Sequence, residues 1–113
     1  MSLTLDRSSI AAALDAVTDI SGYDDEGPMN SVGDAWARWA GYDAQGPMLL
    51  FESQWKIYVI TGGTPSDAMH FLDSHLDAIL SAIQALAFIA SVRPIQFDPS
   101  ALYGVEITAS KES

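Results

Sequence analysis

Hydrophobic and polar residues alternate over residues 48–61, and the spacing then changes to that of a helix over residues 65–86. In the first stretch, five apolar residues occupy odd-numbered positions: Leu49, Phe51, Trp55, Ile57 and Val59. This alternation is typical of a strand with one buried face. In the second stretch an apolar residue recurs every three or four positions: Met69, Leu72, Leu76, Ile79, Leu80, Ile83 and Leu86. The pattern therefore predicts a central strand followed by an amphipathic helix, with the two apolar faces sharing one core.

The residues between these two elements predict where the strand ends and the helix begins. Gly62 and Gly63 interrupt the strand. Thr64 can cap the free N–H groups of a helix, and Pro65 suits the first helical position, where no donor is needed. Asp67 then faces the positive end of the helix dipole. The helix is therefore expected to start at this point.

The rest of the chain supplies one more helix and several shorter strands. A cap at Asp6 or Ser8 predicts a first helix, with one apolar face formed by Ile10, Ala13, Leu14 and Val17. Strands are expected at 20–23, 34–42, 88–97 and 103–108. Pro94 lacks a backbone donor, so it predicts an edge position or a bulge in the third of these strands.

The order of elements predicts a single α+β domain over residues 1–113. We expect two layers, with a mixed or mainly antiparallel sheet of four to five strands and two helices packed on one face. Exposed loops are expected at 24–33 and 40–47, and a frayed tail at 110–113.

Charge excludes one broad class of function. Fifteen acidic residues against five basic ones give a net charge of −10. Binding to nucleic acid through phosphate contacts needs a basic cluster, which the sequence lacks. The absence of cysteine excludes disulfides and thiolate metal sites. We see no signal peptide and no membrane span in the sequence, so a protein that is intracellular when made and has no membrane partner is expected.

The candidate catalytic chemistry is weak. His70, Asp73 and Asp77 share one helix face, and a hard divalent ion could use such carboxylates as ligands, but a solvated helix face explains them better. The glycine pair before the helix resembles a phosphate-binding loop, but no lysine follows and Asp67 would repel an anion. No serine lies in a nucleophile elbow. We therefore predict no catalytic, cofactor-binding or metal-binding residues, no cofactor and no enzymatic activity.

The tryptophans indicate a contact surface instead. In a regular strand Trp36 and Trp39 point to opposite sides of the sheet, so only one of them can enter a helix-covered core. The other, with Tyr58, would lie on the uncovered face, where a partner is the simplest explanation of a large aromatic side chain. A bulge that brings both to one side is the alternative. The predicted interface residues, including those of the first loop, are Trp36, Trp39, Tyr42, Tyr58, Met29, Asp24, Asp25 and Glu26.

Several segments together resemble a known protein family. They are the alanine-rich opening helix, the strand entry Gly33–Trp36 (GDAW), the strand Phe51–Val59 (FESQWKIYV), the helix segment Asp73–Ile79 (DSHLDAI), and the closing strands around 92–94 and 102–108. Over nearly its whole length the chain resembles the tail terminator proteins of long-tailed, siphovirus-type bacteriophages, especially those that infect actinobacteria.

The resemblance implies a non-enzymatic virion protein. Such a protein forms a ring, typically a hexamer, at the head-proximal end of the tail tube. It would end tube polymerisation and dock to the head-tail connector or stopper protein. Its expected partners are copies of itself, the major tail tube protein and that connector, while genomic DNA passes through the lumen without specific binding.

Two other functions compete with this hypothesis. The acidic surface could mimic nucleic acid, which would make the chain a small binding or inhibitory module that acts on a basic host protein. A metal-dependent enzyme built on His70, Asp73 and Asp77 is the third hypothesis, and it requires a specific bound divalent ion.

Overall fold

The computed structural model describes residues 3–23, 31–45, 50–97 and 102–112. Within these residues the chain forms two helices and five strands. In chain order they are α1 (Leu3–Asp15), β1 (Ser21–Tyr23), β2 (Asp34–Gln45), β3 (Leu50–Gly62), α2 (Pro65–Gln84), β4 (Phe88–Gln96) and β5 (Tyr103–Glu112).

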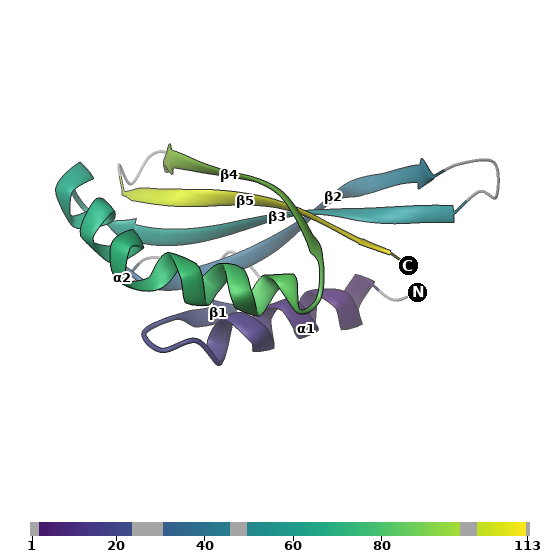
Figure 1. The fold of residues 1–113 in the computed structure, drawn as a ribbon, viewed down its shortest axis with the longest axis horizontal. Helices are drawn as coiled ribbons and strands as arrows, with labels where there is room; N and C mark the ends of the chain where they lie inside the picture. The colour runs from purple at the N-terminus through teal and green to yellow at the C-terminus, as the bar shows by residue number, and fades with distance from the viewer. Residues whose placement is uncertain (1–2, 24–30, 46–49, 98–101, 113) are drawn as a thin grey trace.

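The strands form one mixed sheet in the order β1-β2-β3-β5-β4. The short β1 runs parallel to β2, and the other neighbouring pairs are antiparallel. Both helices lie on the same side of the sheet, while the outer ends of β2 and β3 extend beyond them (Figure 1). The predicted two-layer α+β fold is therefore confirmed, with five strands.

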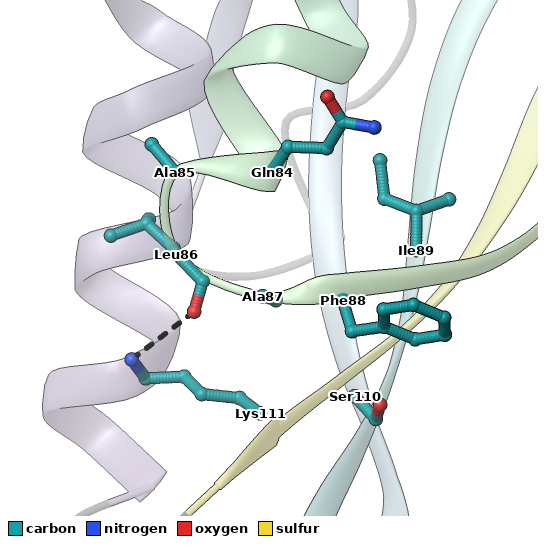
Figure 2. A pocket seen from close by; sticks show the side chains of 8 residues that line it. All are labelled: Gln84, Ala85, Leu86, Ala87, Phe88, Ile89, Ser110 and Lys111. Atoms are coloured by element: carbon teal, nitrogen blue, oxygen red, sulfur yellow. Dashed lines mark hydrogen bonds between the residues drawn. The ribbon is translucent and has the colours of Figure 1, made fainter.

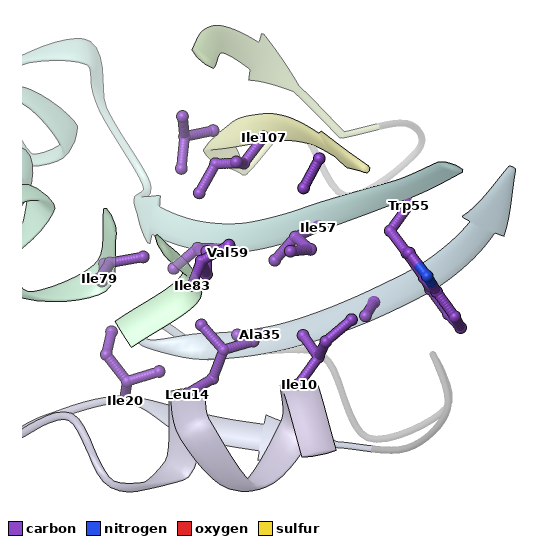
Figure 3. Packing of buried hydrophobic residues seen from close by; sticks show 13 residues of the cluster. Ile10, Leu14, Ile20, Ala35, Trp55, Ile57, Val59, Ile79, Ile83 and Ile107 are labelled. Carbon is purple, nitrogen blue, oxygen red and sulfur yellow. The ribbon is translucent and has the colours of Figure 1, made fainter. Parts of the chain in front are cut away.

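The core forms where the helices meet one face of the sheet. On β3 the alternating residues Trp55, Ile57 and Val59 are buried, as the sequence pattern predicts. Figure 3 shows the helix and strand side chains that converge on this face. The remaining members of the cluster come from α1, the adjoining turn, β2, α2 and β5: Ile10, Leu14, Ile20, Ala35, Ala37, Ile79, Ile83, Val105, Ile107 and Ala109. One face of the sheet is thus filled by both helices, and no helix of the described residues lies over the other face.

The predicted start of α2 is confirmed. The Thr64 hydroxyl accepts a hydrogen bond of 3.1 Å from the backbone N–H of Asp67, and Pro65 occupies the first turn. Met69, however, is 62% exposed, so its place in the predicted apolar stripe is wrong. Ala68 takes the buried position in this turn. Because successive helical residues are rotated by about 100°, Met69 is turned away from the sheet.

The predicted cap of the first helix is also wrong. Helix α1 already includes Leu3, so Asp6 lies in its first turn and Ser8 in its interior. The apolar face of this helix is placed correctly, since Ile10 and Leu14 are both buried. Sequence pattern fixed the buried face but not the first residue of the helix.

The hairpin of β2 and β3 is longer than the sequence predicts. The predicted loop at 40–47 is wrong over residues 40–45, because β2 continues to Gln45 and pairs there with Leu50. The predicted frayed tail is wrong as well, because β5 continues to Glu112 and pairs with Glu52. Both neighbours of β3 find backbone partners along its outer half, which keeps them extended. Residues 46–49 and most of the predicted loop at 24–33 lie outside the described residues.

Strand β4 forms one edge of the sheet and pairs only with β5 among the described strands. Pro94 lies in this strand opposite Val105, so its missing donor is accommodated at an edge as predicted.

Candidate interaction surface

The two tryptophans of β2 lie on opposite faces of the sheet. Residues 35–39 pair with 59–55 without interruption, and the register shifts only after Trp39. The bulge therefore does not reach Trp36. Ala35 and Ala37 are in the core, so Trp36 between them points to the face that the helices leave uncovered.

Trp39 points to the same face of the sheet as the core residues of β2, but it lies outside the core cluster. It is 42% exposed and pairs with Trp55, which is only 1% exposed. The buried tryptophan of this protein is therefore Trp55, on β3, and neither tryptophan of β2 is fully buried.

Three aromatic rings follow one another across the uncovered face. Trp36 of β2 stacks on Tyr58 of β3 with ring centroids 6.0 Å apart and planes 24° apart. Phe97, just after β4, meets Tyr58 edge to face at 6.1 Å. The Phe97 ring covers Gly104 so closely that a Cβ there would lie 2.3 Å from it. The rings therefore form a continuous aromatic row over β2, β3 and β5.

The Trp36 indole has little freedom to move within this row. Its Nε1 is buried and has no hydrogen-bond partner among the described residues. Ring packing, and not a hydrogen bond, therefore sets its position.

Basic side chains lie beside the aromatic row. The Arg38 guanidinium lies 5.8 Å from the centroid of the Tyr58 ring, within cation–π range. Lys56 is opposite Arg38 on β3. On β4, Arg93 is opposite Glu106 of β5, which places it on the same face. We call the set Trp36, Arg38, Lys56, Tyr58, Arg93 and Phe97 the sheet-face patch.

One acidic residue balances part of this charge. The Lys56 Nζ lies 3.4 Å from Glu106 Oε1, and it also donates to the Thr108 hydroxyl at 3.4 Å. Arg38 and Arg93 are both exposed. The sheet-face patch thus combines flat apolar rings with positive charge, although the chain as a whole is strongly acidic.

The outer surface of the helix layer has the opposite character. Exposed carboxylates lie along α2 and at the end of α1 and the turn after it: Asp67, Asp73 and Asp77, and Asp15 and Asp19. Asp73 and Asp77 are one helical turn apart on the outer face of α2. The two layers of the subunit therefore present different charge to their surroundings.

A histidine joins the two halves of this helix layer. His75 of α2 lies with its Nε2 3.0 Å from Asp19 Oδ2 and its Nδ1 2.9 Å from the carbonyl oxygen of Phe71. The hydrogen bond to the Asp19 carboxylate is the main reason that the pKa of His75 is raised above 6.5, and the Phe71 carbonyl adds to it. Both partners are acceptors, so only the doubly protonated ring donates to both. His75 therefore links α2 to the turn after α1.

An open groove lies where α2 gives way to β4. It is lined by residues 84–89 together with Ser110 and Lys111, and the Lys111 Nζ donates to the Leu86 carbonyl at 3.5 Å (Figure 2). Phe88 at its rim is 73% exposed. The groove is therefore of mixed character, with polar lining residues beside the exposed Phe88 ring.

The predicted interface residues fall into three groups. Trp36 and Tyr58 meet on the uncovered face, while Trp39 lies on the other face. Tyr42 is in β2 opposite Ser53, and its side chain is outside the described part. The loop residues lie outside the described residues altogether: Asp24, Asp25, Glu26 and Met29. The contact role of all eight stays a prediction.

The sequence analysis did not include Arg38, Lys56, Arg93 or Phe97 in the surface. Arg38 is two residues from Trp36 on β2, and Lys56 is two residues from Tyr58 on β3. Strand alternation puts each on the same face as its aromatic neighbour, so the sequence could have predicted these two basic residues. Arg93 and Phe97 join the patch only through the pairing of β4 with β5, for which the local sequence offers no signal.

The other candidate sites find no support from geometry. Among the described residues, no group of three or more His, Asp or Glu side chains is arranged to hold a metal ion. His70, Asp73 and Asp77 lie along the exposed outer face of α2. No helix in the described ranges is long and apolar enough to cross a membrane.

Comparison with known proteins assigns no family and no function to this chain. No protein-family model matches the sequence, and no curated protein matches it either. Among solved structures, a chain of the "Virion of native gene transfer agent (GTA) particle" is similar with a TM-score of 0.44 and 12% identity, over 92% of this chain and 84% of that chain. A similarity at this level establishes no shared function.

Proposed function

We propose that this protein is a structural component of a bacteriophage virion, a tail terminator that forms a ring on the head-proximal end of the tail tube. The sequence resemblance suggests this role. The observation that carries it is the sheet-face patch, a sheet surface without a helix over it that presents stacked aromatic rings and exposed arginines.

The physical argument starts from the cost of such a surface. A large aromatic side chain that stays partly exposed on a rigid sheet is stabilised further by burial against a partner. Aromatic residues and arginine are also the residues that dominate the binding energy of protein interfaces. This arrangement suits a subunit of a larger assembly.

The shape of the subunit also fits assembly. The outer ends of β2 and β3 reach beyond the helices, and β4 offers an edge strand (Figure 1). A contact between two different surfaces, repeated by a rotation that closes, generates a ring. In this role the ring stops addition of tube protein and presents its other side to the head-tail connector or stopper, and DNA passes through it without specific binding.

The direct test is the length of tubes. Purified tail tube protein is polymerised with and without this chain, and tube lengths are measured by electron microscopy. We expect uncontrolled lengths without the chain and arrested growth with it. The Trp36→Ala variant should fail to arrest growth, while Trp36→Phe, which keeps a ring against Tyr58, should retain most of the effect. Tubes whose length is the same with and without the protein would contradict the proposal.

The acidic helix layer supports one alternative. Carboxylates on the outer side of α2 could imitate the phosphates of nucleic acid and occupy a basic site on a host protein. That module would be absent from purified particles and would bind its target with a steep salt dependence. Mass spectrometry of purified virions separates the two functions, because a terminator must be present in stoichiometric amounts.

A further inference from the structure

We propose that the sheet-face patch of one subunit binds the acidic outer surface of α2 on a second copy of the chain. The inference rests on the proposed ring and names the two surfaces that meet in it. Because the sheet-face patch and α2 belong to different layers of the subunit, this contact is head-to-tail and leaves each surface free to bind the next copy.

Segregation of charge is the first argument. Three of the five basic residues of the chain belong to the sheet-face patch: Arg38, Lys56 and Arg93. Glu106 neutralises one of them through its ion pair with Lys56. The exposed acidic side chains of the described helix layer lie on the opposite side of the sheet, with Asp73 and Asp77 on α2. One layer therefore complements the other in sign.

Like charges placed side by side are the second argument. Arg38 and Lys56 are directly opposite each other on adjacent strands, an arrangement that costs stability in a sheet. Asp73 and Asp77 are four residues apart on a helix, where like charges also repel. The Lys56–Glu106 ion pair offsets part of the repulsion on the sheet face, and the repulsion that remains in each pair is relieved when the other pair is brought against it.

The third argument is area. The two longest extents of the molecule are 46 and 25 Å, so the sheet face can supply the roughly 800 Å² that one partner buries in a standard interface. The aromatic row beside the arginines provides the apolar centre that such an interface needs. Asp43, Glu52 and Glu112 are neighbours in register at the outer end of the sheet. Glu52 is about 13 Å along β3 from Lys56, beyond one Debye length in physiological salt.

Charge reversal of each surface tests the contact. One variant carries Arg38→Glu and Arg93→Glu, which leave the Lys56–Glu106 pair intact. The other carries Asp73→Lys and Asp77→Lys. All four positions are exposed, and circular dichroism checks that both variants keep the wild-type fold. Native mass spectrometry and sedimentation velocity then measure the oligomeric state over a range of salt and protein concentrations.

Each variant alone should lose self-assembly, with the midpoint shifted to at least about tenfold higher protein concentration. An equimolar mixture should assemble again. The acidic, reversed sheet face of the first variant repels the acidic α2 of its own copies, but it attracts the basic, reversed α2 of the second variant. A single chain with all four substitutions should also assemble, and it keeps the wild-type net charge of −10 because the two reversals cancel.

The outcomes separate this inference from the proposed function. If the wild type assembles and either variant assembles equally well, the sheet-to-helix contact is wrong, but the proposed ring is not contradicted. The same holds if both variants lose assembly and their mixture fails to restore it. If the wild-type chain stays monomeric at every salt and protein concentration, the self-assembling ring is contradicted together with the contact.

Discussion

Trp36 and Tyr58 stack across β2 and β3, with ring centroids 6.0 Å apart, on the face of the sheet that neither helix covers. The pair lies opposite a core that is already complete on the other face. Its rings are therefore available to a partner without any change in the fold of the subunit.

Removal of this pair should affect assembly more than folding. Trp36→Ala is expected to lower the free energy of unfolding by only about 1 to 2 kcal/mol, because the side chain is half-buried and loses one aromatic contact. Chemical denaturation measures this change, and sedimentation velocity measures assembly. Trp36→Phe is the matched control and should assemble. A Trp36→Ala protein that assembles like the wild type would remove the aromatic row from the interface.

The His75–Asp19 link should make stability depend on pH. The raised pKa of His75 means that the folded state binds the proton more tightly than the unfolded state. The stabilisation is therefore complete below the unfolded pKa of about 6.5 and is lost as the pH rises through the higher folded pKa. We expect an effect of at most about 1 kcal/mol, because Asp19 is well exposed to solvent.

Asp19→Asn isolates this effect. Asp19 has a φ of 69°, which asparagine also tolerates, so the substitution removes the charge without imposing a new backbone conformation. Unfolding free energies of the wild type and the variant should differ below pH 6 and converge at high pH. A constant difference across this range would show that the titration of His75 does not stabilise the fold.

The close approach of α1 to β1 predicts a sensitive glycine. A Cβ at Gly22 would lie 2.1 Å from the backbone carbonyl oxygen of Ala11, and backbone cannot move aside as a side chain can. Gly22→Ala should therefore destabilise the protein by about 1 to 3 kcal/mol. At Gly63 an added Cβ meets nothing within 4 Å, so Gly63→Ala is the control and should change the melting temperature little. Equal melting temperatures for both variants would contradict the packing of α1 on β1.

The cap of α2 can be tested in the same way. Thr64→Ala removes the acceptor of the Asp67 N–H and should cost about 1 kcal/mol. Ser66→Ala, in the exposed first turn two residues later, should change the unfolding free energy by a few tenths of that amount. Thermal unfolding of the two variants compares them. A loss at Ser66 as large as that at Thr64 would indicate that the hydroxyl of Thr64 does not cap the helix.

Local pattern was enough to predict most of the fold. Alternation around Trp55, Ile57 and Val59 identifies the buried face of β3, and the change of spacing after Gly62 identifies α2. These features depend on neighbours within a few residues, so a single sequence contains them. The length of the β2–β3 hairpin depends instead on which strands pair. The turn residues near Gly46 therefore do not predict where β2 ends.

The candidate surface was only partly predictable for the same reason. Strand alternation places Trp36 and Trp39 on opposite faces of the sheet, but it does not predict which face the helices cover. Arg93 and Phe97 reach Tyr58 only through the order β3-β5-β4, which brings residues about forty positions apart side by side. Such long-range neighbours follow from topology, and no local motif announces them.

A reconstruction of the purified phage tail by electron cryomicroscopy tests the central claim most directly. The account predicts a closed ring of this chain at the head-proximal end of the tube, with Trp36 and Tyr58 of each copy buried against the next copy. A particle that lacks the chain, or one in which every copy leaves these two rings open to solvent, would contradict it.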